Sequence, residues 1–301
     1  ANEAWLVDTL TGYVEAMPLA FDPRRTSDTE HGGVLGYLQS IAISPNGRGA
    51  ALPGTHANIG AGRFRDGGEL TFESTVRAAV AFVRVDGSED PSTRKLFDDR
   101  GLASAAVYSP AGDYLYVLDR GARSLERLDV LTGTQSGTYL DVGFAPQGVA
   151  VSANGAWLYV DAYMSRELAV YDAEGFGRRV DATGRYPVLS REPLDAALLR
   201  GKQLFNDAFD TRLSRASYIS CGHCHLDGES DNLVWDFTSR GEGLRNTTSL
   251  LGRAGTGHGP VHWSANFDEI QDFEHDIRNA FQGSGLMSDS DFREGGRDQT
   301  L

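Results

Sequence analysis

The residues most capable of chemistry are the five from Cys221 to His225, whose sequence is C-G-H-C-H. Two cysteines separated by two residues and followed at once by a histidine form the attachment signature of c-type haem. The two thiols add to the vinyl groups of the porphyrin, and the histidine after them becomes an axial ligand of the iron. We therefore expect one covalent haem on Cys221 and Cys224, with His225 as its proximal ligand.

A dithiol redox site and a zinc site are the alternatives for this cysteine pair. A redox C-x-x-C opens a helix after a strand in a βαβ unit, and a four-cysteine zinc site requires a second pair. Cys221 and Cys224 are the only cysteines of the chain, and no βαβ pattern surrounds them. Both alternatives are therefore disfavoured.

The sixth iron ligand decides what a haem at this site could do. Methionine gives a low-spin iron suited to electron transfer, whereas an open or exchangeable position admits peroxide or oxygen. We predict Met287, which lies on a glycine-rich loop after a predicted helix. His262 is the alternative, an open position is the third case, and His258 is a further candidate. His223 lies inside the attachment turn and is not expected to reach the opposite face of a haem.

Helical patterns are predicted on both sides of the attachment turn. Before it, Pro193 opens a segment in which Leu198 and the pair Leu204-Phe205 recur at helical spacing. After it, apolar residues mark one face of a second predicted helix, with His275 on the solvent side. The members of that face are Phe267, Ile270, Phe273, Ile277 and Phe281.

The first 180 residues contain an internal repeat. Each unit ends a strand on an aspartate before a polar turn, and Asp86, Asp129 and Asp172 are spaced by 43 residues. A period of this length, built from four short strands, is typical of a β-propeller blade; a β-sandwich is the alternative. Each unit also carries a tight turn that follows a short apolar strand. These turns lie at 44–47, 109–112 and 152–155.

The repeat is incomplete within this sequence. Residues 1–8, with Thr11-Gly12 after them, match the second half of one further unit, so about three and a half blades are predicted, with an insertion at 55–75. A closed ring has about four to eight blades. An open array exposes sheet faces and strand edges. We therefore expect further polypeptide to complete the ring.

Two family resemblances extend these observations. Residues 36 to 175 resemble the YVTN-type propeller family, whose units carry S-P-x-G, Y-V, D and T-G. Residues 195 to 287 resemble the bacterial dihaem cytochrome c peroxidase and methylamine-utilisation (MauG-like) family, through G-K-x-L-F, the attachment signature, L-R-N and P-x-H in that order. The second resemblance implies a cytochrome c-like domain.

The same resemblance implies roles for two further residues and shows two departures. Arg245 and Asn246 would bond a haem propionate or the backbone around it; an arginine on a surface loop is an equal alternative. His262 is followed by Trp263-Ser264 where the family has Asp-Gly, and only one C-x-x-C-H is present where the family has two. These departures leave the peroxidase chemistry of the family in doubt for this chain.

Charge and hydropathy bound the partners. The 301 residues carry 28 Lys and Arg against 42 Asp and Glu, a formal net charge of −14. Such a field repels nucleic acid and anionic lipid, so no nucleic-acid partner is expected. No apolar run reaches the ~20 residues of a membrane span. Covalent haem is attached outside the cytoplasmic membrane in bacteria, which predicts a periplasmic or extracellular location. Carboxylates near Asp227 and Asp231 make a calcium ion possible.

These observations predict an all-β partial propeller at residues 1–180, a linker at 181–192 and an all-α cytochrome c-like domain at 193–301. The tail from 288 to 301 is polar, so we expect other polypeptide to supply the helix that closes a cytochrome core. The leading function is electron transfer by a monohaem c-type cytochrome to a redox partner protein, with the propeller as scaffold or docking surface. A haem peroxidase or oxidase and a haem-stapled surface protein are the alternatives.

Overall fold

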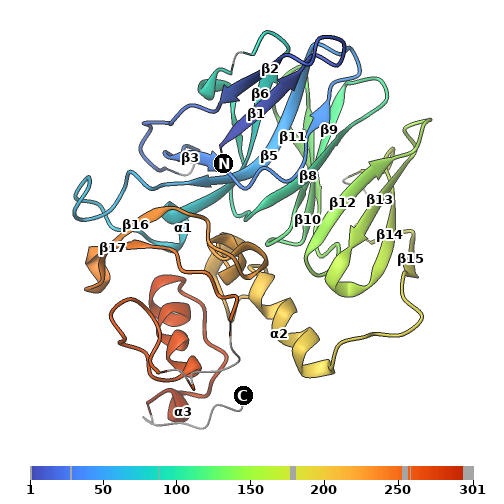
Figure 1. The fold of residues 1–301 in the computed structure, drawn as a ribbon. Helices are drawn as coiled ribbons and strands as arrows, with labels where there is room; N and C mark the ends of the chain where they lie inside the picture. Colours follow the sequence, from blue (N-terminus) through green and yellow to red (C-terminus); the bar gives the residue numbers. More distant parts are fainter. Residues whose placement is uncertain are drawn as a thin grey trace.

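The computed structural model describes residues 2–27, 29–87, 89–176, 181–252, 257 and 259–293. The regular structure of the chain up to residue 187 consists mainly of antiparallel β-strands, and the remainder consists mainly of loops and short helices. A two-stranded hairpin and three larger sheets follow one another along the chain. Figure 1 shows the sheets standing in a row, with the C-terminal segment across one end of them.

The hairpin consists of β1 (Glu3–Val7) and β2 (Val14–Pro18). The first large sheet contains β3 (Val34–Gly36), β4 (Ala42–Ile43), β5 (Gly49–Ala57), β6 (Val76–Arg84) and β7 (Lys95–Leu96). The second contains β8 (Ala103–Tyr108), β9 (Tyr114–Asp119), β10 (Ser124–Asp129) and β11 (Gln135–Tyr139). The third contains β12 (Pro146–Val151), β13 (Trp157–Ala162), β14 (Glu167–Asp172) and β15 (Gly184–Pro187).

The repeated turns join β4 to β5, β8 to β9 and β12 to β13, one pair of antiparallel strands in each large sheet. Gly47, Gly112 and Gly155 adopt φ of 67°, 77° and 75°, a conformation that glycine enters without steric cost. The serine that starts each turn accepts a hydrogen bond from the amide five residues later, as in Trp157 N–H to Ser152 Oγ at 2.9 Å. The same turn chemistry therefore produces the same meander three times, as the repeat predicts.

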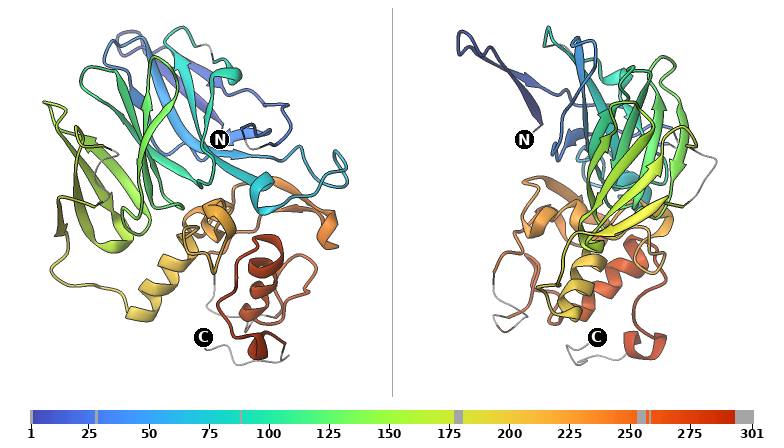
Figure 2. Two further views of the ribbon diagram at one scale, coloured as in Figure 1. Left: turned by 180° about the vertical axis from the view of Figure 1, so that it is seen from behind. Right: turned by 90° about the vertical axis from the view of Figure 1, so that its right-hand side faces the viewer.

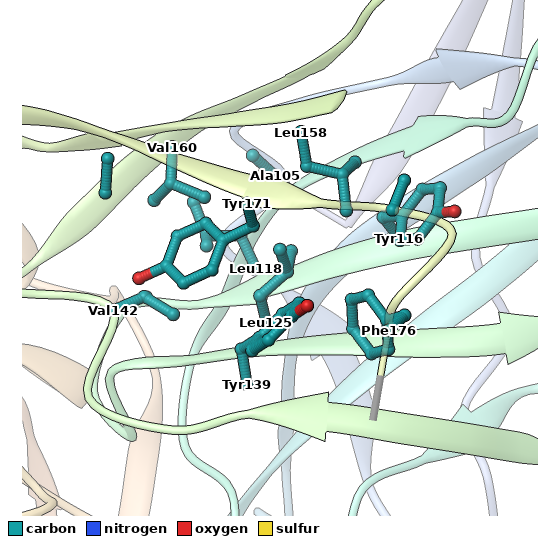
Figure 3. Close-up of a cluster of buried hydrophobic side chains, with 12 residues drawn as sticks. Ala105, Tyr116, Leu118, Leu125, Tyr139, Val142, Leu158, Val160, Tyr171 and Phe176 are labelled. Carbon is teal, nitrogen blue, oxygen red and sulfur yellow. The ribbon is translucent and has the colours of Figure 1, made fainter. Parts of the chain in front are cut away.

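Consecutive sheets pack face to face through apolar side chains. Alternate residues of β9 and β10 point to opposite faces, so one face of the second sheet contacts the first sheet and the other contacts the third. Figure 3 shows the contact between the second and third sheets. There the Tyr139 ring lies 4.6 Å from that of Tyr171 and 4.5 Å from that of Phe176, measured between ring centroids. Ala4 and Met17 of the hairpin pack on the first sheet in the same manner.

The predicted helices are present with different bounds. The first is α2 (Ala196–Asn206), which begins after Asp195 caps the Ala197 amide. The second is an irregular helical segment made of Ile270–Phe273 and Asp276–Ala280. Two further α-helices are α1 (Phe72–Thr75), inside the predicted insertion, and α3 (Asp289–Arg293).

Two features differ from the sequence-based expectation. The predicted linker 181–192 supplies β15, the fourth strand of the third sheet, where Tyr186 is paired with Leu168. The predicted all-α segment 193–301 contains a hairpin of β16 (Val234–Phe237) and β17 (Gly243–Asn246). Both were obscured because these strands are only four residues long and contain glycine or charged residues, so neither carries an alternating apolar pattern.

Candidate functional site

The attachment turn has the backbone geometry that brings two cysteines three residues apart to the same side. Cys221–His223 forms a 3₁₀ turn that follows Ser220. A 3₁₀ helix has three residues per turn, so side chains at i and i+3 are eclipsed, which places Cys221 above Cys224. Neither cysteine forms a disulfide; Cys221 is exposed and Cys224 is half-buried. Cys221 is therefore open to a ligand from solvent, whereas Cys224 also packs against Ile219 and Trp235.

His225, directly after this turn, is oriented by a backbone carbonyl. Its Nδ1 lies 2.9 Å from the carbonyl oxygen of Thr248, which can only accept a hydrogen bond, so Nδ1 carries the proton. The remaining nitrogen, Nε2, is then the unprotonated one. Burial lowers the pKa of His225 below its usual value, which favours the neutral ring. A histidine that donates one ring N–H to a carbonyl and presents the other nitrogen is the usual metal-ligating arrangement.

The loop that carries His262 is hydrogen-bonded to the segment that contains Thr248. The Trp263 indole donates to the carbonyl oxygen of Asn246 at 2.8 Å, two residues before Thr248. His262 Nδ1 lies 3.0 Å from Asn266 Oδ1, and its ring packs on Phe267, with 4.4 Å between centroids. Burial is the main cause of the lowered pKa of His225, and His262 is close enough to contribute to it. The structure thus brings His225 and His262 into one neighbourhood, each with Nδ1 already engaged.

Met287 is anchored through its backbone. Its amide donates to Glu274 Oε1 at 3.1 Å, and its carbonyl oxygen accepts from the Arg278 guanidinium at 2.6 Å. The Met287 side chain is half-buried. His258 lies outside the described residues. His223 is fully buried against the sheets, in agreement with its exclusion as a distal ligand.

Arg245 and Asn246 lie on β17, where other groups engage their side chains. Arg245 Nε is 3.3 Å from Glu242, and the Asn246 side-chain amide donates to the Leu233 carbonyl oxygen at 3.1 Å. Together with Trp263, they line an open pocket of about 320 Å³.

The carboxylates considered for calcium also have partners. Asp227 pairs with Arg120 at 3.0 Å, and Asp231 accepts from the Trp235 indole at 2.9 Å. Within the described residues, no group of three or more His, Cys, Asp or Glu side chains is arranged to hold a metal ion.

Sequence reasoning did not foresee that the sheets themselves contact the attachment turn. The Tyr37 hydroxyl, from the first sheet, donates to the Cys224 carbonyl oxygen at 2.9 Å. Tyr218 donates to Asp98 and stacks under Arg77, with 5.3 Å from the guanidinium carbon to the ring centroid. Trp235 and Ile219 pack with Cys224 against Ala57 and Val76. Tyr37 has a φ of 56° and belongs to no motif, so no sequence signal marked it.

The comparisons with known proteins leave the family open. No family model matches the chain, and no curated protein matches it. Among solved structures, it is similar to Kuenenia stuttgartiensis hydrazine synthase, with 12% sequence identity and a TM-score of 0.37. That match covers 57% of this chain and 65% of the other, so the chain spans less than two thirds of it. Within the described residues, no helix is both long and apolar enough to cross a membrane.

Proposed function

We propose that this chain carries one covalent c-type haem and transfers electrons outside the cytoplasmic membrane. The observation that carries the proposal is a 3₁₀ turn that holds Cys221 and Cys224 three residues apart, next to a His225 whose Nδ1 is held by Thr248. The donor set, two thiols and an imidazole nitrogen, is the one that c-type haem requires. When bound, the haem supplies a one-electron couple.

The residues of the chain would hold and tune that group. Cys221 and Cys224 would form the thioether links, and His225 Nε2 would coordinate the iron. The Thr248 carbonyl fixes the imidazole orientation and raises its basicity, which are the usual effects of such a partner. Met287 remains our proposed sixth ligand because a thioether favours electron transfer. Arg245 would have to leave Glu242 to reach a propionate.

A peroxidase or oxidase is the second candidate, and one observation favours it. His262 is exposed, its Nδ1 is engaged by Asn266, and its loop is tied to the segment of Thr248, which holds His225. A histidine in this position could act as an exchangeable ligand or as a proton donor beside an open coordination site. A visible spectrum separates the two functions: a methionine–iron charge-transfer band supports electron transfer, and high-spin iron supports the enzyme.

The sheets are proposed to be blades of a β-propeller that continues beyond the hairpin and the third sheet. Tyr116 and Leu125 of the second sheet pack against the third sheet. Their equivalents 43 residues later, Tyr159 and Leu168, belong to the outer face of the third sheet, where a groove of about 460 Å³ is lined with apolar side chains. The residues that form the contact between the second and third sheets therefore recur on the outer face of the third sheet. We propose that a further sheet of the same repeat packs on that face.

The hairpin offers the matching surface at the other end of the row. Ala4 and Met17 face the first sheet, whereas Trp5 and Val7 on the opposite side are 61% and 52% exposed. Figure 2 shows this hairpin projecting from the row of sheets. By the register of the repeat, Trp5 and Val7 correspond to Ala169 and Tyr171, which pack on the preceding sheet.

Acrylamide quenching and intact mass together test the missing sheet. In protein purified from its source, Trp157 should be shielded from acrylamide. The quenching of Trp157 is obtained as the difference between this protein and a Trp157→Phe variant. The intact mass should show polypeptide beyond these 301 residues. Leu168→Glu should expose Trp157, whereas Leu131→Glu, in a turn where Leu131 is 94% exposed, should not. A 301-residue monomer with Trp157 open to acrylamide would overturn this part of the proposal.

A further inference from the structure

The two residues between the cysteines are packed against different parts of the protein. A Cβ placed on Gly222 would lie 2.9 Å from Asn206 Oδ1 and 3.4 Å from the Phe205 carbonyl oxygen, both at the end of α2. His223, the second of the two, is fully buried against the sheets. The attachment turn is therefore enclosed on the sides that do not carry the thiols.

The His223 ring fills a slot formed by two glycines. A Cβ on Gly101 would lie 2.3 Å from His223 Nε2, and a Cβ on Gly121 would lie 2.7 Å from His223 Cε1. Gly101 lies two residues before β8, and Gly121 lies in the turn between β9 and β10. The two glycines are hydrogen-bonded to each other, from Gly121 N–H to the Gly101 carbonyl oxygen at 3.1 Å. Any side chain at either position would displace the ring.

The ring is fixed at its other edge by the turn itself. The Ser220 amide donates to His223 Nδ1 at 2.9 Å, so Nδ1 is an acceptor and the neutral ring carries its proton on Nε2. Within the described residues, that Nε2 has no hydrogen-bond partner. A buried donor without a partner costs free energy, so hydrogen bonding at Nε2 does not explain why the ring is placed there. The placement of the ring is instead explained by its steric fit between Gly101 and Gly121.

The sheets hold the neighbourhood of the turn at further points. Arg120, next to Gly121, pairs with Asp227 at 3.0 Å, and the Ala208 amide donates to the Gly121 carbonyl oxygen at 2.9 Å. Together with the Tyr37 bond to Cys224, these contacts come from two of the three large sheets. His223 is the member of this set that lies within the C-x-x-C-H motif.

We propose that His223 is a positioning residue, which locks the haem attachment turn onto the β-sheets through the Gly101–Gly121 slot. This inference rests on the proposed haem function, and it names the sheet module as the part that sets the orientation and burial of the haem edge. Burial is one of the factors that set the reduction potential of a haem. The geometry of the slot should therefore be measurable in that potential.

A double-mutant cycle between Gly121→Ala and His223→Ala in the full chain tests the slot. Overpacking a filled site costs about 1–3 kcal/mol, so Gly121→Ala should raise the unfolding equilibrium constant about fivefold to 150-fold when His223 is present. With His223 truncated, the Cβ added at Gly121 would still lie 3.0 Å from the Gly101 carbonyl oxygen, so the same change should retain a cost, but one several-fold smaller in the equilibrium constant. Gly148→Ala is the control, because its Cβ would lie 3.4 Å from Asp161 Cβ, an ordinary contact. If His223→Ala fails to fold, His223→Asn keeps an acceptor for Ser220 and is shorter than the ring.

Two readouts separate this inference from the proposed function. Unfolding followed by far-ultraviolet circular dichroism does not require haem; equal costs of Gly121→Ala in both backgrounds would overturn the slot. The reduction potential of the haem should shift in the Gly121→Ala variant. In the double variant it should equal the potential of the His223→Ala variant. A coupled unfolding cycle with an unchanged potential would overturn the positioning role. Absence of covalent haem would overturn the proposed function while leaving the unfolding result decisive for the slot.

Discussion

Acidification should destabilise this protein through a pair of buried histidines that are not part of the attachment turn. His31 and His56 are both fully buried, with their Nδ1 atoms 3.3 Å apart. Arg94, which can only donate, lies 2.9 Å from His56 Nε2, and the Ser74 carbonyl oxygen, which can only accept, lies 3.1 Å from His31 Nε2. One proton therefore fits between the two Nδ1 atoms, and both rings must be neutral.

The sign and size of the effect follow from this arrangement. Burial, and then the charge of Arg94, lower the pKa of His56 from 6.5 to about 4. Burial, and then His56, lower the pKa of His31 well below its usual value, with Arg77 adding to the effect and Asp22 opposing it. As the pH falls, the unfolded chain binds these protons before the folded protein does. The contribution of the neutral histidine pair to the free energy of unfolding is therefore complete above pH 6.5 and is lost as the pH falls toward 4. For His56 alone the loss is about 3 kcal/mol, at about 1.4 kcal/mol per pH unit.

Guanidinium unfolding at several pH values between 7.5 and 4.5 measures this loss. The wild-type protein should lose stability steadily below pH 6.5. A His31→Gln/His56→Gln variant, less stable at pH 7.5, should show a flatter profile over the same range. The exposed His275 provides the control, since His275→Gln should keep the wild-type slope. A wild-type slope retained in the double variant would refute the reasoning.

Three further outcomes are expected. Arg100→Met should destabilise the fold by about 3–5 kcal/mol, because Arg100 Nε pairs at 2.5 Å with the buried Glu126 and Asp119 is buried beside them. Guanidinium midpoints check this against Arg84→Met on the surface, and equal midpoints would contradict it. Asp236→Ala should speed amide hydrogen exchange at Phe64 and Arg65, whose N–H groups donate to Asp236 at 2.7 and 3.0 Å, without affecting Gly47. Met287→Ala should convert the iron to high spin, whereas a low-spin visible spectrum retained in that variant would identify His262 as the ligand.

The repeat made the sheet region predictable because each unit repeats the same local chemistry. Ser152, Gly155 and Asp172 define a turn, a hairpin and a strand end without reference to distant residues, and the strands were found where they were expected. The short strand β15 was not predicted because its strand conformation depends on pairing with β14 at Leu168, and the residues of β15 themselves carry no strand pattern.

The site was predictable only in its covalent core. Cys221, Cys224 and His225 form a contiguous motif, so their chemistry follows from spacing alone. Thr248, Tyr37 and Gly121 act through a carbonyl, a hydroxyl and a missing side chain, each of which depends on the tertiary fold. Such contacts have no periodicity or composition that a single sequence reveals.

Mass spectrometry of the peptide that contains Cys221–His225 tests the central claim most directly. Protein from a haem-attaching host should be treated with acid–acetone, digested and compared with a Cys221→Ser/Cys224→Ser variant. The account predicts that the wild-type peptide retains the mass of one haem through this treatment and that the variant peptide carries none. Haem that acid–acetone extracts, or a wild-type peptide with two unmodified thiols, would contradict it.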